Sequence, residues 1–140
     1  MSIAPVSLLL ALLASLADSF YTMYRYSARH FNVEYSMLLS GKTKVAVVTV
    51  SCSGEGPQFG PIGLTVSGFF SIAKTTKNPG PYGTYHVTKK DKLRNFNAKI
   101  VDSCNKNIVA HDFDDVLIND YELIVTVENI TRVFTEEAAY

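Results

Sequence analysis

The sequence has little charge and no excess of either sign. Thirteen of its 140 residues are Lys or Arg and thirteen are Asp or Glu, so the formal net charge is zero, and charged residues make up 19% of the chain. Such a chain has no overall field that would recruit nucleic acid or a membrane. Hydrophobic residues make up 47%, which indicates a packed core rather than disorder. We expect one small domain and no nucleic-acid partner.

Cysteine is also scarce. Cys52 and Cys104 are the only two cysteines, and no Cys-x-x-Cys motif is present, which argues against a zinc site. In an oxidising compartment an isolated pair usually forms one disulfide. We therefore predict a Cys52–Cys104 bridge, which would stabilise the fold by about 4 kcal/mol in the chain-entropy model.

Long hydrophobic runs are absent. Residues 6–17 are largely apolar, end in small side chains and precede Asp18, whereas a membrane-spanning helix needs about 20 apolar residues. The layout is typical of a secretory signal peptide, although no Lys or Arg precedes the apolar core. We expect a signal peptide over 1–17, with cleavage after Ala17 or as late as Ser19, a secreted extracellular protein and no transmembrane span. The alternative is an N-terminal helix retained in the fold.

Groups that do chemistry are few. No Ser/His/Asp constellation is recognisable, and His111, Asp112, Asp114 and Asp115 are the best cation candidate because clustered carboxylates suit calcium. The glycine and terminal glutamate of a calcium loop are missing, so we favour a solvated acidic turn. We predict no enzymatic activity, no metal and no cofactor.

Strand periodicity recurs along the chain, while helical periodicity is scarce. Apolar residues alternate with polar ones over Phe31–Met37 and Tyr121–Val127, and Lys44–Cys52 is β-branched and apolar. Short strands separated by Gly/Pro turns predict an all-β, antiparallel sandwich of about seven strands. We place the main domain at residues 44–137.

Four segments within that domain carry weaker, interrupted or local patterns. Gly68 interrupts the strand pattern over 62–72, which predicts a bulge or a hairpin turn. Residues 89–95 favour a loop or one short helix, and 96–102 favour a strand. Residues 112–120 read as acidic and irregular.

An aromatic N-terminal segment, residues 20–43, precedes the main domain. It contains four tyrosines, Tyr21, Tyr24, Tyr26 and Tyr35. Exposed aromatics suit protein interfaces, but they equally suit an extra strand of the sandwich. We favour the extra strand.

Four segments follow one another in the domain: Val47–Cys52 (VVTVSC), Gly83–Val87 (GTYHV), Ala98–Asn105 (AKIVDSCN), and Leu123–Ile130 (LIVTVENI) followed by Phe134. In their order and approximate spacing they resemble the transthyretin-like family of secreted nematode proteins. The turn after Cys52, residues 53–57, departs from the family pattern, so this would be a divergent member. The resemblance implies a prealbumin-like β-sandwich, an extracellular location and no established enzymatic activity.

Two surface features suggest contact with a partner or modification. Lys89, Lys90, Lys92 and Arg94 could bind an anionic partner, such as a phospholipid headgroup or a sulfated glycan, or could simply keep a loop soluble. Asn129 begins the sequon Asn-Ile-Thr and is a candidate N-glycosylation site. Basic residues concentrate between residues 74 and 106 and acidic ones after 111, which indicates either a two-sided partner surface or two solvated faces.

Three functions follow from these features. The first is a secreted, non-enzymatic binding protein whose loops contact an extracellular protein, lipid or glycan. The second is a carrier of a small apolar ligand, such as a lipid or a hormone-like molecule, in a sandwich or dimer pocket lined by Leu123 and Val125. The third is a secreted hydrolase. The identity of the partner and the oligomeric state are left open.

Overall fold

The described residues, 20–53 and 63–137 of a computed structural model, form eight strands and one helix. The signal peptide predicted over 1–17 and most of the Gly/Pro loop after Cys52 lie outside them. The elements in chain order are β1 (Phe20–Ala28), β2 (Phe31–Ser40), β3 (Thr43–Cys52), β4 (Leu64–Lys74), β5 (Gly83–Val87), α2 (Lys90–Cys104), β6 (Asp115–Ile118), β7 (Glu122–Val127) and β8 (Ile130–Glu136).

The strands form one antiparallel sheet that closes into a barrel. Each strand pairs with the next along the chain, and β8 returns to β1 through Tyr24 opposite Glu136 and Arg25 opposite Thr135. The predicted all-β, antiparallel architecture is confirmed, but the sandwich of about seven strands is wrong. In a sandwich and in a barrel alike, buried and exposed residues alternate along each strand. Only the pairing of β8 with β1 distinguishes the two architectures here.

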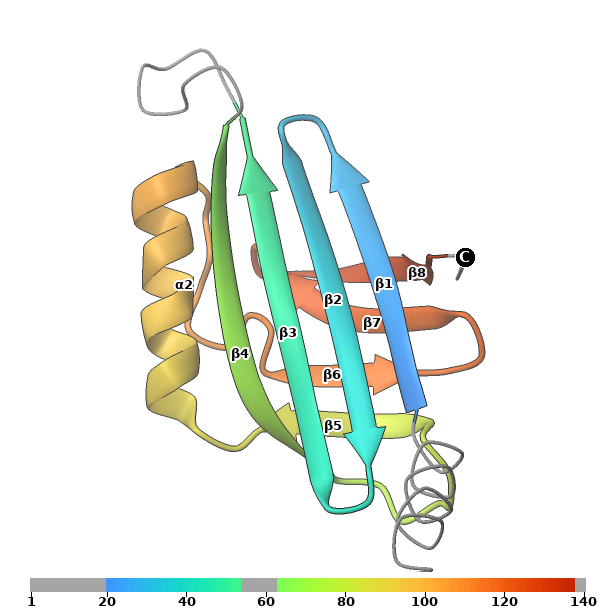
Figure 1. Cartoon of the computed structure of the whole chain (residues 1–140). Helices are drawn as coiled ribbons and strands as arrows, with labels where there is room; N and C mark the ends of the chain where they lie inside the picture. The colour runs from blue at the N-terminus through green and yellow to red at the C-terminus, as the bar shows by residue number, and fades with distance from the viewer. Residues whose placement is uncertain (1–19, 54–62, 138–140) are drawn as a thin grey trace, which may run out of the picture.

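The barrel has two unequal halves. The long strands β1–β4 lie across the shorter strands β5–β8, as Figure 1 shows. Three residue pairs join β4 to β5 and two join β8 to β1, whereas β3 and β4 share eight. The halves are thus broad sheets that meet at two narrow seams.

The aromatic N-terminal segment forms two strands rather than one. Tyr24 on β1 and Tyr35 on β2 are cross-strand partners, and both side chains are buried. The prediction that this segment belongs to the sheet is therefore confirmed, and it supplies a quarter of the barrel wall. Tyr21 alone among its four tyrosines is largely exposed, at 63%.

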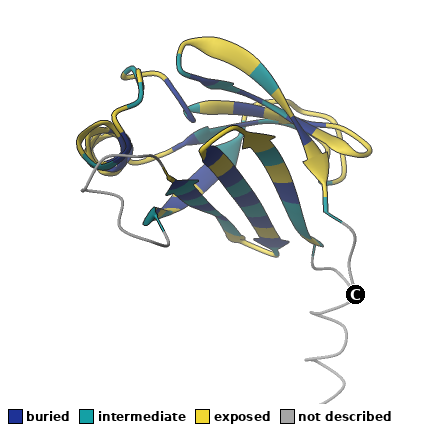
Figure 2. Cartoon of the chain, turned by 90° about the horizontal axis from the view of Figure 1, so that it is seen from above, coloured by how far each residue is buried: buried dark blue, intermediate teal, exposed yellow. Residues whose placement is uncertain are grey.

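Side chains pointing inward fill the barrel. Along β2, every second residue from Phe31 to Leu39 is buried. Figure 2 shows buried residues alternating with more exposed ones along the strands. The largest fully buried side chains are mostly aromatic: Tyr24, Phe31, Tyr35, Phe70, Tyr85, Phe113 and Phe134. Burying side chains of this size supplies most of the driving force for folding.

Residues 90–104 form a helix, so the strand predicted over 96–102 is wrong. Phe96, Ala98 and Ile100 alternate as a strand would, but the buried positions are Leu93, Phe96, Asn97, Ile100 and Cys104. That spacing of three and four residues places them on one helical face, which is turned toward the barrel in Figure 2. The prediction of a short helix is thus met by a longer helix that includes both segments.

Gly68 lies within an uninterrupted strand, so the predicted bulge or hairpin turn is wrong. A Cβ at this position would lie 2.6 Å from a ring carbon of Phe96 and 2.5 Å from one of Phe70. The glycine instead leaves space for the Phe96 ring, which meets Phe70 edge-on at 5.2 Å. The missing side chain lets α2 approach β4 closely.

The predicted disulfide is confirmed. Cys52, the last residue of β3, is bonded to Cys104, the last residue of α2, and both are buried. Together with the Gly68–Phe96 contact, the bond fixes the middle and the C-terminal end of the helix beside β4, where no strand within the described residues pairs with residues 64–71 on that side. The helix therefore closes the wall where the hydrogen-bonded sheet is incomplete (Figure 1).

Candidate functional site

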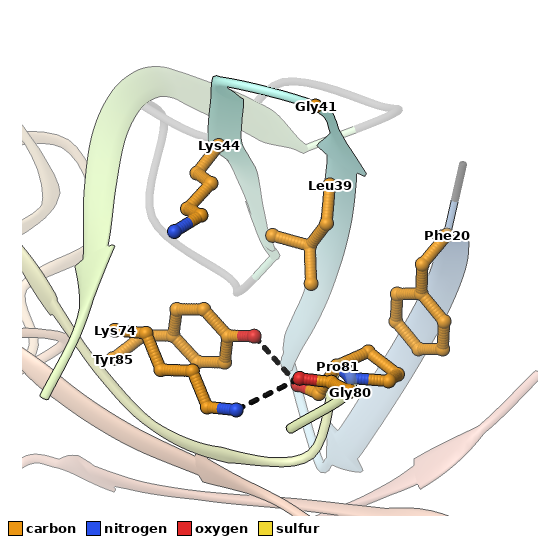
Figure 3. Close-up of a pocket in the computed structure, with 8 residues that line it drawn as sticks. All are labelled: Phe20, Leu39, Gly41, Lys44, Lys74, Gly80, Pro81 and Tyr85. Carbon is orange, nitrogen blue, oxygen red and sulfur yellow. Dashed lines mark hydrogen bonds between the residues drawn. The ribbon is translucent and has the colours of Figure 1, made fainter. Parts of the chain in front are cut away.

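A pocket of about 240 Å³ opens at the end of the barrel where β1 begins and the β2–β3 hairpin turns. Its residues come from β1–β5 and from the loop between β4 and β5, and Figure 3 draws all of them. They are Phe20, Leu39, Gly41, Lys44, Lys74, Gly80, Pro81 and Tyr85. We refer to this site as the barrel-mouth pocket.

The β2–β3 hairpin places a cation beside an apolar side chain. Beside the turn, Ser40 lies opposite Thr43. The following pair, Leu39 opposite Lys44, faces into the barrel. Alternation along β3 then makes Lys44 continuous with the buried row Ala46, Val48 and Val50. Lys44 is half-buried and points toward the pocket in Figure 3.

A hydrogen-bonded loop forms the opposite rim. The Lys74 ammonium donates to the carbonyl oxygens of Asn78 and Gly80, the latter at 2.8 Å. The Tyr85 hydroxyl donates to the Pro81 carbonyl at 2.6 Å (Figure 3). The loop is thus bound to β4 and β5 through side chains, and it holds Pro81 against the pocket.

Gly83 allows this loop to close. Its φ is +140°, and a Cβ there would lie 2.2 Å from the Thr76 hydroxyl and 2.9 Å from the Lys74 side chain. Only glycine avoids both the backbone penalty and these contacts. The Gly/Pro-rich segment over residues 78–83 therefore shapes one side of the pocket.

The pocket is positively charged and lined by apolar groups. Lys44 forms no ion pair within the described part of the chain, whereas the Lys74 ammonium is bound by carbonyl oxygens. Burial raises the pKa of Tyr85 above its ordinary value. Leu39, Phe20 and Pro81 provide the walls, a combination that suits an anion attached to an apolar body.

Aromatic side chains support the pocket from β1. Phe20 meets Tyr82 edge-on at 6.1 Å. Burial, followed by the nearby Glu136 carboxylate, raises the pKa of Tyr24 to about 12. Both tyrosine and phenylalanine side chains thus fix the start of β1 against the loop.

The predicted basic residues lie at the start of α2, outside this pocket. Lys90 pairs with Asp114 and Arg94 with Asp91. The Lys92 ammonium lies 5.5 Å from the centre of the Phe69 ring. Lys89, at the helix N-cap, is exposed and, like Lys92, forms no ion pair among the described residues.

The acidic segment is partly ordered, and its buried carboxylate binds the backbone. Asp112 is fully buried and accepts hydrogen bonds from the amides of Val109, Glu128 and Asn129 at 2.8–3.1 Å. Within the described residues no group of three or more His, Cys, Asp or Glu side chains is arranged to hold a metal ion. Residues 115–118, predicted as irregular, form β6.

Asn129 lies in the tight turn between β7 and β8. Glu128 and Asn129 both have positive φ, at 57° and 58°, as expected for a two-residue hairpin turn. Asn129 is exposed, so its side chain is accessible to a glycosylating enzyme. Glycosylation at Asn129 stays a prediction.

The barrel-mouth pocket differs from the ligand site predicted from the sequence. Leu123 and Val125 are buried inward-facing residues of β7 and do not line it. Lys44 and Lys74 are 30 positions apart, and only the hairpin register and the loop bring them together. A lysine at an inward-facing strand position was the available signal, because such positions usually carry apolar side chains.

Compared with protein-family models, with curated proteins and with solved structures, the chain matches none of them. Among the described residues, no helix has the length and hydropathy to cross a membrane. The likeness to the transthyretin-like family stays a prediction.

Proposed function

We propose that the protein is a secreted, non-enzymatic binding protein that holds a small organic anion with an apolar body in the barrel-mouth pocket. The observation that carries this proposal is Lys44, a half-buried lysine directed into an apolar-walled pocket and without an ion pair in the described part of the chain. An eight-stranded barrel commonly has its interior filled by side chains or holds one small ligand.

The charge on the pocket selects the kind of ligand. A carboxylate near Lys44 would make a charge-assisted hydrogen bond, which is stronger than one between neutral groups. The hydrocarbon part of the same molecule would contact Leu39, Phe20 and Pro81. A purely apolar ligand, as in the carrier function inferred from the sequence, would leave the ammonium group of Lys44 without a partner.

A saturated carboxylate of medium chain length is a suitable probe. We expect octanoate to bind the full chain in a calorimetric titration, and octanol and octylammonium to bind much more weakly. Lys44→Met keeps the hydrocarbon stem and removes the charge. It should weaken octanoate binding about 10- to 100-fold, the range expected for losing a charged hydrogen bond.

Lys77→Met is the matched control. Lys77 lies in the exposed loop after β4 and does not line the pocket, so its loss should leave the octanoate affinity unchanged. Equal affinity of the parent and Lys44→Met for octanoate would contradict the proposal. Absence of octanoate binding to the parent would contradict it too.

A further inference from the structure

The outer face of β1–β4 is apolar at one end and polar at the other. Outward-facing residues of adjacent strands form rows across the sheet, and the strand pairing gives their order. Ser40 and Thr43 form the outward-facing pair nearest the β2–β3 turn. The next two rows are Tyr21, Leu38, Val45 and Ser71, and Met23, Ser36, Val47 and Phe69. We call their six apolar members, without Ser36 and Ser71, the outer apolar rows.

The next rows are polar. Arg25, Glu34, Thr49 and Ser67 form one of them, and Arg25 is ion-paired with Glu34 and Glu137. Within the outer apolar rows, Tyr21 is 63% exposed, Phe69 52% and Leu38 36%. Large side chains that are exposed and adjacent mark an interaction surface more often than isolated ones do.

Unpaired lysines border the same rows. Lys42 is at the tip of the β2–β3 hairpin, beyond the Ser40–Thr43 pair and on the mouth side of the Leu38–Val45 pair. Lys92 lies over the Phe69 ring, and Lys99 lines a hollow with Phe69 between β4 and α2. None of these three forms an ion pair within the described residues.

Charge complementarity identifies the partner. A second copy of the chain would bring the same lysines to the border of the interface, and like charges there disfavour association. An anionic lipid surface supplies headgroups for the lysines and an apolar layer for the outer apolar rows. Basic residues next to exposed aromatic and aliphatic side chains are typical of proteins that lie on membranes without crossing them.

We propose that the outer apolar rows and the bordering lysines Lys42, Lys92 and Lys99 form a docking surface for membranes that contain anionic lipid. Tyr21, Leu38 and Phe69 enter the headgroup layer, and the lysines contact the phosphates and carboxylates around them. This docking does not depend on a ligand in the barrel-mouth pocket.

Co-sedimentation with vesicles tests the docking surface. We expect the full chain, recovered from the medium of expressing cells, to bind phosphatidylcholine vesicles containing phosphatidylserine and to bind pure phosphatidylcholine vesicles at least tenfold more weakly. Leu38→Ser/Phe69→Ser should lower binding to the anionic vesicles at least tenfold, because both side chains lose their contact with the apolar layer. Lys42→Glu/Lys92→Glu should lower it by at least tenfold as well.

Each double variant has a matched control on another face. Leu117→Ser/Val133→Ser removes two apolar side chains that are 40% and 46% exposed on β6 and β8, away from the proposed surface. Arg29→Glu reverses an exposed charge in the β1–β2 turn, at the opposite end of the barrel. Both controls should bind the anionic vesicles as the parent does, and circular dichroism should show that every variant is folded.

Three results would overturn the proposal. The first is that Leu38→Ser/Phe69→Ser binds the vesicles as tightly as the parent, which would place binding elsewhere, including at any N-terminal residues that remain. The second is equal binding to both kinds of vesicle. The third is self-association of the parent without vesicle binding, which would assign the surface to a second copy.

Discussion

Asp112 is a buried residue whose side chain binds the backbone of two separate segments. Its buried carboxylate accepts amide hydrogen bonds from Val109, Glu128 and Asn129, which belong to two separate segments of the chain. The side-chain amide of Asn97, on α2, donates to the backbone carbonyl of Asp112 at 3.1 Å. One residue thus links the helix, the segment after it and the β7–β8 turn.

Replacing Asp112 by Asn should lower the free energy of unfolding by about 2–4 kcal/mol. An amide retains one acceptor oxygen but directs an NH₂ group at a backbone amide that also needs an acceptor. Urea unfolding followed by circular dichroism measures the change. Asp120→Asn, at an exposed position, is the control and should change stability by less than about 0.5 kcal/mol; an equally small change at Asp112 would contradict this role.

At the residue scale the sequence could predict the disulfide but not the pocket. Cys52 and Cys104 are the only two cysteines, so each has one possible partner within the chain. The sequence pattern predicted that Asp112 lies in a solvated acidic turn. The neighbouring residues do not indicate that the amides of residues 128 and 129 bind its carboxylate. Lys44 and Lys74 become pocket residues only through pairing between strands, which a local pattern does not contain.

Helix α2 completes the barrel wall beside β4 by contacts between side chains. Its buried face packs on the core, Phe96 occupies the space left by Gly68, and Cys104 is bonded to Cys52. In contrast, β2 is held by backbone hydrogen bonds on both sides. We therefore expect the helix to depend on the disulfide more than any strand does.

Removing the disulfide with Cys52→Ala/Cys104→Ala should lower the free energy of unfolding by about 4 kcal/mol, given the separation of 52 residues. Hydrogen exchange should show faster exchange of the α2 amides while β2 and β3 keep their protection. Dithiothreitol should have the same effect on the parent and none on the variant. Unchanged protection of α2 in the variant would contradict its dependence on the bond.

At the element scale, alternation predicted strands well and the helix poorly. The inward-facing residues of β2 and β7 follow the period of two seen in the sequence, whereas β3 was predicted from its β-branched, apolar composition. In α2 the same alternation over residues 96–100 is coincidental, and the decisive spacing begins at Leu93. The bulge or turn predicted at Gly68 is wrong for a similar reason. This glycine leaves space for Phe96 of a helix that packs against the strand, and the local sequence does not show that helix.

Buried tyrosines couple the stability of the whole molecule to alkaline pH. Burial raises the pKa of Tyr35 and of Tyr85 above the ordinary value, and that of Tyr24 to about 12. Carboxylates act in the same direction, Asp114 on Tyr35 and Glu136 on Tyr24. The folded state therefore favours the neutral phenol.

Stability should be constant up to about pH 10, the pKa of an unfolded tyrosine, and then fall as the pH rises. The buried tyrosines have higher pKa values in the folded chain than in the unfolded chain, so the unfolded chain loses its phenol protons at lower pH. A rising pH therefore favours the unfolded state. Urea unfolding at about pH 9 and about pH 11 measures the loss. Tyr35→Phe should reduce the loss, whereas Tyr121→Phe, at a position 73% exposed, should not; a flat profile in the parent would contradict the prediction.

At the scale of the whole molecule, the sequence located the basic residues but not the apolar side chains beside them. The cluster at residues 89–94 suggested an anionic partner such as a phospholipid headgroup, although a net charge of zero provides no overall field toward a membrane. In the folded chain, however, unpaired lysines border one apolar area. The β1–β8 pairs that close the barrel were equally inaccessible to a reading of local patterns.

The position of those closing pairs in the chain determines the order of events during synthesis. Residues 20–74 form one complete half of the wall, and all of its partners within that half are already made when the ribosome reaches β5. Glu136, which pairs with Tyr24, and Glu137, whose amide donates to the Met23 carbonyl and whose side chain pairs with Arg25, follow all the other strands in the chain. The ring can therefore close only after β8 has been made, and until then the edge of β1 is open to any other strand in its surroundings.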